Sequence, residues 1–192
     1  MEPKEKLIKG DASNEPANLK KISEVNNFVN VEFGNLVICS ANEEHVKELG
    51  ELWANLAAIQ QVFAPQRYDF GTEGKDWQAF VKKKLSKEHN LLLVAQDKGC
   101  YEVKGFLYLQ TIVIPSSDLI LKGVTEDIYT KPQYRKQNIA SKMLSVALNW
   151  THEQNIKQVD FVSIDKTRGL SEFYTHFLSS CKPAVNLELL RV

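Results

Sequence analysis

The sequence predicts an α/β (α+β) fold in which helices flank a mixed, mostly antiparallel sheet. Two long apolar segments, residues 91–96 and 103–114, flank a short polar segment, and this pattern is typical of an antiparallel hairpin. A third strand is predicted at residues 119–130, and a helix-periodic stretch separates it from another strand at residues 158–164. A helix between two strands indicates a crossover connection, so the sheet should be mixed. The predicted order is β-α-α-β-β-β-α-β-α-β.

Local periodicity places the other elements. Residues 35–41 predict a short apolar strand that ends at a helix N-cap, either Ser40 or Asn42. Two helices follow, with apolar residues at Val46, Leu49, Trp53 and Leu56 (Gln60 is the polar exception) and at Trp77, Phe80, Val81 and Leu85. We expect the basic run at residues 82–84 to form a solvated face of the second helix. Two later helices have the same spacing at Ile139, Met143, Ala147 and Trp150 and at Leu170, Phe173, Tyr174 and Phe177, and alternation predicts a last strand over Val185, Leu187 and Leu189.

The bulk properties suit one cytoplasmic domain. We expect residues 1–30 to be a flexible polar extension and residues 31–192 to form the domain, since a chain of 192 residues fits one core with an appendage. Lysine plus arginine equals aspartate plus glutamate, at 24 each, and this balance argues against nucleic acid or an anionic membrane as the main partner. No apolar run approaches the roughly 20 residues that cross a bilayer, and the charged start lacks the apolar core of a signal peptide.

The cysteines argue against a metal site. There are three, Cys39, Cys100 and Cys181, without a Cys-x-x-Cys motif and without clustered histidines. A disulfide framework or a zinc site is therefore not expected. Each cysteine is interpreted as a small core hydrophobe, with a nucleophile as the alternative.

The segment at residues 131–140 places cations and free amides at the start of a helix. The first amides of a helix lack partners, and together with the helix dipole they attract an anion. Lys131, Arg135 and Lys136 supply positive charge at this point. If a strand end splays away beside this helix, it leaves room for an extended ligand that carries phosphate. The alternative is an ordinary helix start that binds only water.

Motifs on both sides of this helix start carry a family resemblance. Pro132, Tyr134, Arg135, Ile139 and Ala140 match a pattern of Val-x-Pro and an aromatic residue, followed by Arg/Gln-x-x-Gly-x-Gly/Ala at the head of a helix. Thr130 replaces the valine and Asn138 replaces the central glycine. Phe173 and Tyr174 match a second pattern, from which Thr167, Leu170, Leu178 and Ser179 depart, and Gly105 matches a hairpin glycine. With this order of elements, the chain from about Asn35 to Val192 resembles the Gcn5-related N-acetyltransferase (GNAT) family.

The resemblance implies a GNAT-like fold and an enzyme that moves an acetyl group from acetyl-CoA to an amine, without a metal. The expected acetyl-CoA-binding residues are Ile128, Tyr129, Thr130, Arg135, Lys136, Gln137, Asn138, Ile139, Ala140 and Thr167. Asparagine tolerates positive φ, so Asn138 should keep the loop conformation. Its side chain, however, occupies space where glycine lets pyrophosphate approach.

Two residues are candidates for the chemistry. Glu126 lies before the cofactor loop, and together with Asp127 it resembles the Glu-Asp-Leu-Tyr-Val stretch of diamine and polyamine acetyltransferases, in which the glutamate is implicated as base. Strand alternation predicts that Glu126 shares a face with Ile128 and that Asp127 points to the other face, solvated or in a structural hydrogen bond. A solvated carboxylate is the alternative for Glu126. The resemblance makes Tyr174 the acid that protonates the departing thiolate, and a core aromatic residue is the alternative.

The acceptor is expected to be a primary amine of a small molecule or peptide, and a polyamine or diamine is the first candidate to test. The expected substrate-binding residues are Phe63, Tyr68, Asp69 and Asp127, although the first three also suit a packed loop. A homodimer is left open. One competing hypothesis is a catalytically weakened acyl-CoA-binding or interaction module, which the departures at Thr130, Asn138, Thr167, Leu178 and Ser179 favour. Another is an unrelated α/β domain in which residues 135–140 are a plain helix cap.

Overall fold

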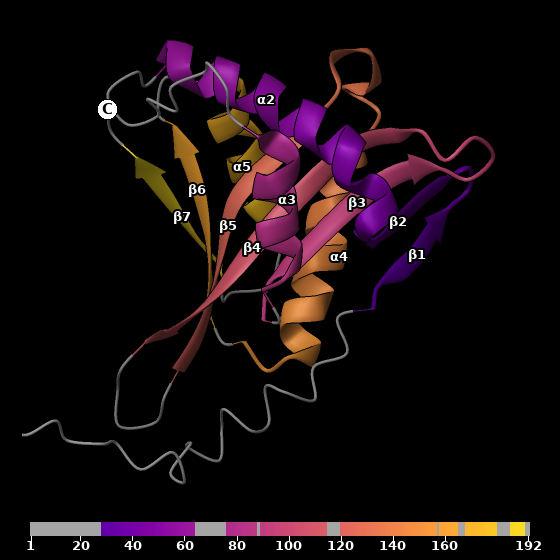
Figure 1. Ribbon diagram of the computed structural model, residues 1–192. Coiled ribbons are helices and arrows are strands. Elements are labelled where there is room, and N and C mark those ends of the chain that lie inside the picture. The colour runs from indigo at the N-terminus through magenta and orange to yellow at the C-terminus, as the bar shows by residue number, and fades with distance from the viewer. Residues whose placement is uncertain are drawn as a thin grey trace, which may run out of the picture.

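The protein forms one seven-stranded sheet, seen in a computed structural model that describes residues 28–63, 76–87, 89–114, 120–156, 158–164, 168–179 and 185–190 (Figure 1). The strands are β1 (Asn30–Phe33), β2 (Leu36–Ser40), β3 (Leu91–Asp97), β4 (Val103–Ile114), β5 (Ile120–Thr130), β6 (Gln158–Ile164) and β7 (Val185–Leu190). They lie in space in the order of the sequence. Neighbours from β1 to β5 are antiparallel, while β5, β6 and β7 are parallel to one another. The predicted mixed, mostly antiparallel sheet is confirmed.

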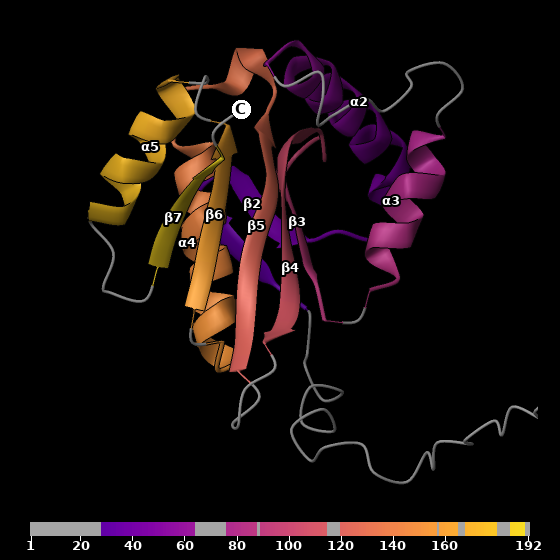
Figure 2. The ribbon, with the colours of Figure 1, turned by 90° about the vertical axis from the view of Figure 1, so that its left-hand side faces the viewer.

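Helices cover both faces of this sheet (Figure 2). One face carries α2 (Val46–Phe63) and α3 (Trp77–Leu85), and the other carries α4 (Ile139–Glu153) and α5 (Arg168–Ser179). Two short 3-10 helices, η1 (Glu43–His45) and η2 (Pro132–Tyr134), come before α2 and α4. Of the two predicted caps, Asn42 is the one that the structure uses, because its side chain accepts a hydrogen bond from the Glu44 N–H at 3.0 Å.

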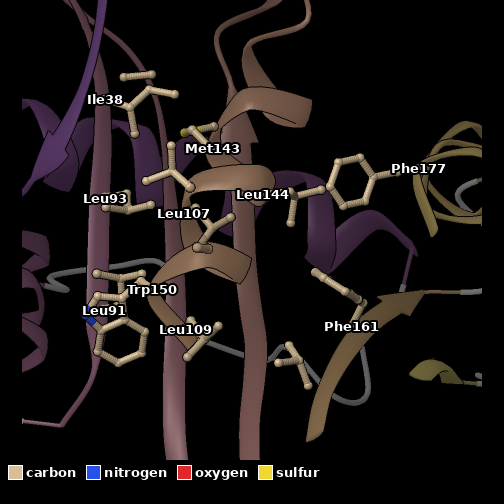
Figure 3. Close-up of a cluster of buried hydrophobic side chains, with 14 of the residues drawn as sticks. Ile38, Leu91, Leu93, Leu107, Leu109, Met143, Leu144, Trp150, Phe161 and Phe177 are labelled. Atoms are coloured by element: carbon tan, nitrogen blue, oxygen red, sulfur yellow. The ribbon is translucent and has the colours of Figure 1, made fainter. Parts of the chain in front are cut away.

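The two faces have separate hydrophobic cores, and β3 contributes to both. Its side chains alternate, with Leu93 buried under α4 and Val94 buried under α2 and α3. Figure 3 shows the α4 side, where Leu144 of α4 lies beside Phe177 of α5. A central strand with both faces covered accounts for the continuous apolar run at residues 91–95.

The structure adds a strand that the sequence analysis missed. β1 pairs with β2 through a tight turn at Gly34, whose φ of 65° lies in the region that favours glycine.

Cys100, interpreted as a core hydrophobe, is instead exposed in the turn between β3 and β4, because that turn projects from the sheet. Residues 1–27, which include most of the predicted extension, lie outside the described residues, as does Cys181. No helix in the described part of the chain has the length and apolar character of a membrane span.

Candidate functional site

The sheet opens between β5 and β6. Residues 122–125 of β5 pair with residues 158–161 of β6, and the register ends there although both strands continue. On its other side, β5 stays paired with β4 up to Thr130. This is the splayed strand end that would leave room for an extended ligand beside α4.

The backbone of β5 presents polar groups to this opening. The Lys131 N–H donates to the Lys104 carbonyl of β4 at 2.9 Å. Because alternate residues of a strand bond to opposite sides, the N–H and C=O groups of Ile128 and Thr130 point away from β4 and towards the opening. Two buried hydroxyls, Thr125 Oγ1 and Thr130 Oγ1, have no hydrogen-bond partner within the described ranges. The backbone groups fit a ligand that brings its own donors and acceptors, as the amide-bearing arm of acetyl-CoA does.

A β-bulge lies where the opening begins. Tyr108 of β4 pairs with Asp127 and its neighbour pairs with Thr125, so Glu126 is an extra residue in the ladder. The bulge shifts the alternation of β5 by one position, and Glu126 and Asp127 both bond to helices on the same face of the sheet. The prediction of opposite faces is therefore wrong. Glu126 does not share a face with Ile128, which packs against the core under α4.

Asp127 is held by α2. Trp53 Nε1 donates to Oδ2 at 3.0 Å and Gln60 Nε2 donates to Oδ1 at 3.2 Å. Gln60 interrupts the apolar face of α2 because it makes this bond. Burial raises the pKa of the Asp127 carboxyl, and the charge of Glu126 adds to the rise, whereas both donors and Lys84 act against it. Asp127 thus has the structural hydrogen bonds that we expected of it, although on the face that Glu126 also uses.

Glu126 contacts α3. Lys84 Nζ lies 3.0 Å from Glu126 Oε2, and the two side chains are 21% and 36% exposed. The same ammonium lies 4.2 Å from the ring centroid of Tyr108 and 5.4 Å from that of Phe80. The other two lysines of the basic run are exposed, so the predicted solvated face is wrong only for Lys84. The helical spacing indicates this position of Lys84, since Lys84 follows Phe80 by four positions and shares its face of the helix.

Tyr108 completes the group on this face. The side chain is 1% exposed, and its hydroxyl accepts a hydrogen bond from Asn90 Nδ2 at 2.6 Å. Burial raises the pKa of Tyr108, and the charge of Glu126 adds to the rise, so the phenol stays neutral. Sequence reasoning named neither Tyr108 nor Lys84 as a site residue, because neither belongs to a motif.

The loop before α4 contains two residues with positive φ. Lys136 and Asn138 have φ of 63° and 60°, both in the left-handed region. Asparagine therefore keeps the backbone conformation for which the family pattern has glycine, as expected. The Asn138 side chain makes no capping hydrogen bond to the first amides of α4. Both side chains are exposed, and backbone of this kind forms concavities that bind anions.

Two of the cations near the loop, Arg135 and Lys131, have partners. Arg135 Nε donates to the Thr130 carbonyl at 3.1 Å, and the guanidinium carbon lies 5.8 Å from the ring centroid of Tyr129. Lys131 Nζ lies 3.2 Å from Glu102 Oε1. These contacts place Arg135 across the end of β5, next to the opening.

Gly105 of β4 sets how closely β5 approaches. A Cβ atom at this position would lie 2.5 Å from the Tyr129 carbonyl oxygen and 3.2 Å from Thr130 Cα. No side chain fits at that distance. The glycine that matched the family's hairpin therefore holds β4 against the segment of β5 that lines the opening.

Tyr174 lies inside the core under α4 and α5. It is 1% exposed, and its ring centroid is 5.3 Å from that of Phe161 and 5.6 Å from that of Phe173. Burial raises the pKa of Tyr174, and the charge of Asp127 adds to the rise, so the phenol stays protonated. These contacts match the core interpretation, and the role as acid stays a prediction.

The structure brings most of the predicted residues together at one end of the sheet. Glu126, Asp127, Ile128, Tyr129, Thr130, Arg135, Lys136, Gln137, Asn138, Ile139 and Ala140 follow one another through β5, the loop and the start of α4. Thr167, Tyr68 and Asp69 lie outside the described residues, as does the side chain of Phe63. Among the described residues, no group of three or more histidine, cysteine, aspartate or glutamate side chains is placed to hold a metal ion.

Comparison with solved structures identifies the architecture. No protein-family model matches the sequence, and no curated protein does. The chain is similar to a predicted acetyltransferase with acetyl-CoA from Clostridium acetobutylicum, with a TM-score of 0.55 and 18% identity over 72% of this chain and 88% of that one. The fold is that of the GNAT family.

Two other matched structures have different descriptions. AAC(6')-Iy in complex with the bisubstrate analogue CoA-S-monomethyl-acetylneamine matches with a TM-score of 0.58 and 13% identity, over 83% of this chain and 99% of that one. A transcriptional regulator from Bacillus halodurans C-125 matches with a TM-score of 0.61 and 15% identity, over 82% of this chain and 98% of that one. At such identities the likeness establishes the GNAT fold alone.

Proposed function

We propose that this protein is an N-acetyltransferase that transfers the acetyl group of acetyl-CoA to a primary amine of a small molecule or protein, by direct attack in a ternary complex. The observation that carries the proposal is the position of Glu126. Glu126 is the bulged residue and directly follows the last residue of β5 that pairs with β6, and the family resemblance implies that this glutamate is the base. Acetyltransferases of the same fold support this choice of reaction.

The residues present fit acetyl-CoA. The backbone of Ile128 to Thr130 would pair with the pantetheine arm, and the amides from Arg135 to Ala140 would hold the pyrophosphate. Thr167 is kept in the proposed cofactor site because of the family pattern. Bound acetyl-CoA supplies an activated thioester.

The chemistry requires one proton to leave the amine before attack. An alkyl amine with a pKa near 10 is mostly protonated at neutral pH, so a base increases the reactive fraction. Glu126 is the proposed base, directly or through water. Tyr174 is the proposed acid for the CoA thiolate, and its raised pKa keeps the required proton on the phenol.

The proposed acceptor is a diamine or polyamine. Two carboxylates, Glu126 and Asp127, lie on the same face of the sheet, and two negative groups suit a ligand with more than one ammonium. Phe63, Tyr68 and Asp69 remain the proposed pocket residues beyond them. We place the reaction in the cytoplasm, where unclustered cysteines stay reduced.

Two measurements test the proposal in sequence. Titration calorimetry with acetyl-CoA should show saturable binding, and the absence of heat and of any thermal shift at millimolar ligand would contradict it. A free-thiol assay over a panel of diamines and other primary amines should then show turnover. Glu126→Gln and Tyr174→Phe should each slow turnover by about a hundredfold while acetyl-CoA still binds. Turnover that survives both substitutions would show that other residues carry the chemistry.

A second candidate is an acyl-CoA-binding module without catalysis. The burial of Tyr174 in an aromatic cluster favours it, because a phenol fixed there serves packing first. Saturable acetyl-CoA binding without thiol release for any amine would select this candidate.

A further inference from the structure

The Lys84 ammonium lies beside Glu126, the proposed base. Its Nζ atom is 3.0 Å from Glu126 Oε2, and the rings of Tyr108 and Phe80 lie 4.2 Å and 5.4 Å away. A carboxylate with aromatic rings beside it is an environment that binds alkylammonium groups. The protein thus fills this environment with an amine of its own.

The environment selects one lysine out of three. Lys82, Lys83 and Lys84 are consecutive in the last turn of α3, but the first two are exposed and Lys84 is 21% exposed. A helix turns each residue by about 100° from the last, so only one of the three can point at β5. Lys82 and Lys83 carry the same ammonium group as Lys84 in a different environment, so they serve as internal controls.

We propose that Lys84 is itself an acetyl acceptor, so that the protein acetylates its own α3. This rests on the proposed function, because it needs acetyl-CoA in the opening and Glu126 as base. The ion pair at 3.0 Å already joins the amine to that base, and attack within one chain needs no separate acceptor molecule.

The step balances without any further reactant. Glu126 accepts one proton from the Lys84 ammonium, and the nitrogen lone pair attacks the thioester carbonyl carbon. The new C–N bond forms as the C–S bond breaks, and the sulfur departs with the bonding electrons. The second proton leaves the nitrogen and ends on the thiolate. The products are an amide at Nζ, CoA thiol and a proton that Glu126 returns to solvent.

The product differs from the starting state in charge. An amide at Lys84 carries no positive charge, so the pair with Glu126 cannot re-form. Self-acetylation should therefore stop after one acetyl group per chain. In the absence of any added amine, thiol release should rise to one equivalent and then end.

The experiment uses the full chain with acetyl-CoA and no added amine. Intact-mass measurement follows the gain of one acetyl group, and tandem mass spectrometry places it among the three lysines. We expect modification at Lys84 with Lys82 and Lys83 unmodified. Acetylation at this position should be absent in Lys84→Arg, and its rate should fall by about a hundredfold in Glu126→Gln. The rate per chain should not change when the protein is diluted tenfold.

Four outcomes would overturn the inference. Equal modification of Lys82, Lys83 and Lys84 would indicate uncatalysed acetylation by the thioester. A rate that falls on dilution would indicate transfer between chains. If calorimetry on the same sample shows acetyl-CoA binding but Lys84 stays unmodified, this inference fails while the proposed function stands. If acetyl-CoA does not bind at all, the proposed function fails and this inference with it.

Discussion

Trp53 Nε1 donates a hydrogen bond to Asp127 Oδ2 at 3.0 Å, and this bond joins α2 to the bulged segment of β5. Glu126 beside it is joined to α3 by Lys84. Two consecutive carboxylates therefore fix two helices to the same point of the sheet. The arrangement depends on the bulge, since regular alternation would turn one of the carboxylates to the opposite face.

Trp53→Phe should destabilise the protein more than Trp150→Phe. Both tryptophans are 3% exposed, so the loss of ring volume is comparable. Trp53 Nε1 bonds to Asp127, whereas Trp150 Nε1 has no hydrogen-bond partner within the described residues. Loss of a donor to a buried carboxylate costs about 1–3 kcal/mol. Urea unfolding of both variants measures the difference, and equal losses would show that the Trp53 bond contributes nothing net.

Asp127→Asn should stabilise the protein at neutral pH and have little effect in acid. The folded-state pKa of Asp127 is raised, so its contribution to stability is fully present below the unfolded pKa of 3.8 and is lost as the pH rises through the folded pKa. Asparagine stays neutral throughout and still accepts from Trp53, while the Gln60 amide can turn to accept from it. Thermal unfolding of variant and wild type at pH 7 and at about pH 4 tests this. A stability difference between variant and wild type that is larger in acid than at neutral pH would contradict this prediction.

Asn138→Gly should tighten acetyl-CoA binding. It removes the side chain that takes space in the proposed pyrophosphate cradle, and it favours the φ of 60° already present. Asn155→Gly is a matched control, because Asn155 has φ of 56° just beyond the other end of α4. Both should change stability by about 1 kcal/mol or less. Only Asn138→Gly should lower the dissociation constant in calorimetry, and weakened or unchanged binding would count against the cradle.

Gly105→Ala should weaken both the fold and acetyl-CoA binding. The added Cβ would lie 2.5 Å from the Tyr129 carbonyl oxygen, so β5 must move away from β4 at the edge of the opening. Overpacking of this kind costs about 1–3 kcal/mol. Gly50→Ala is the control, since a Cβ there meets its nearest atoms at an ordinary 3.5 Å and lies within α2. Thermal unfolding and calorimetry should separate the two variants, and a Gly105→Ala variant with wild-type values in both would contradict the close approach.

The sequence predicted the elements well because they follow from local patterns. Helical periodicity located α2 to α5, apolar runs and turn signals located β2 to β6, and alternation located β7. The tolerance of asparagine for positive φ anticipated the loop at Asn138. The bulge at Glu126 had no such signal, because it depends on how β4 and β5 pair across the ladder. Every error about the faces of β5 follows from that single extra residue.

Residues without a motif were missed for a related reason. Lys84 is one of three adjacent lysines, and composition gives no means to tell them apart. Only the position of α3 over β4 and β5 shows that one of them meets a carboxylate and two rings. Gln60 was noted only as an exception to an apolar pattern, and its bond to Asp127 explains the exception.

The opening between β5 and β6 gives the centre of the sheet two strand edges of the kind that sheets normally have only at their rims. Continuity of hydrogen bonding across the domain is broken there, beyond residues 125 and 161. A ligand lying along β5 would restore that continuity. Binding of the ligand would then decide whether the two halves of the sheet unfold locally as separate units or as one. Hydrogen exchange at the Ile128 and Thr130 amides would then report acetyl-CoA directly, with the Tyr129 amide, which faces β4, as the internal reference.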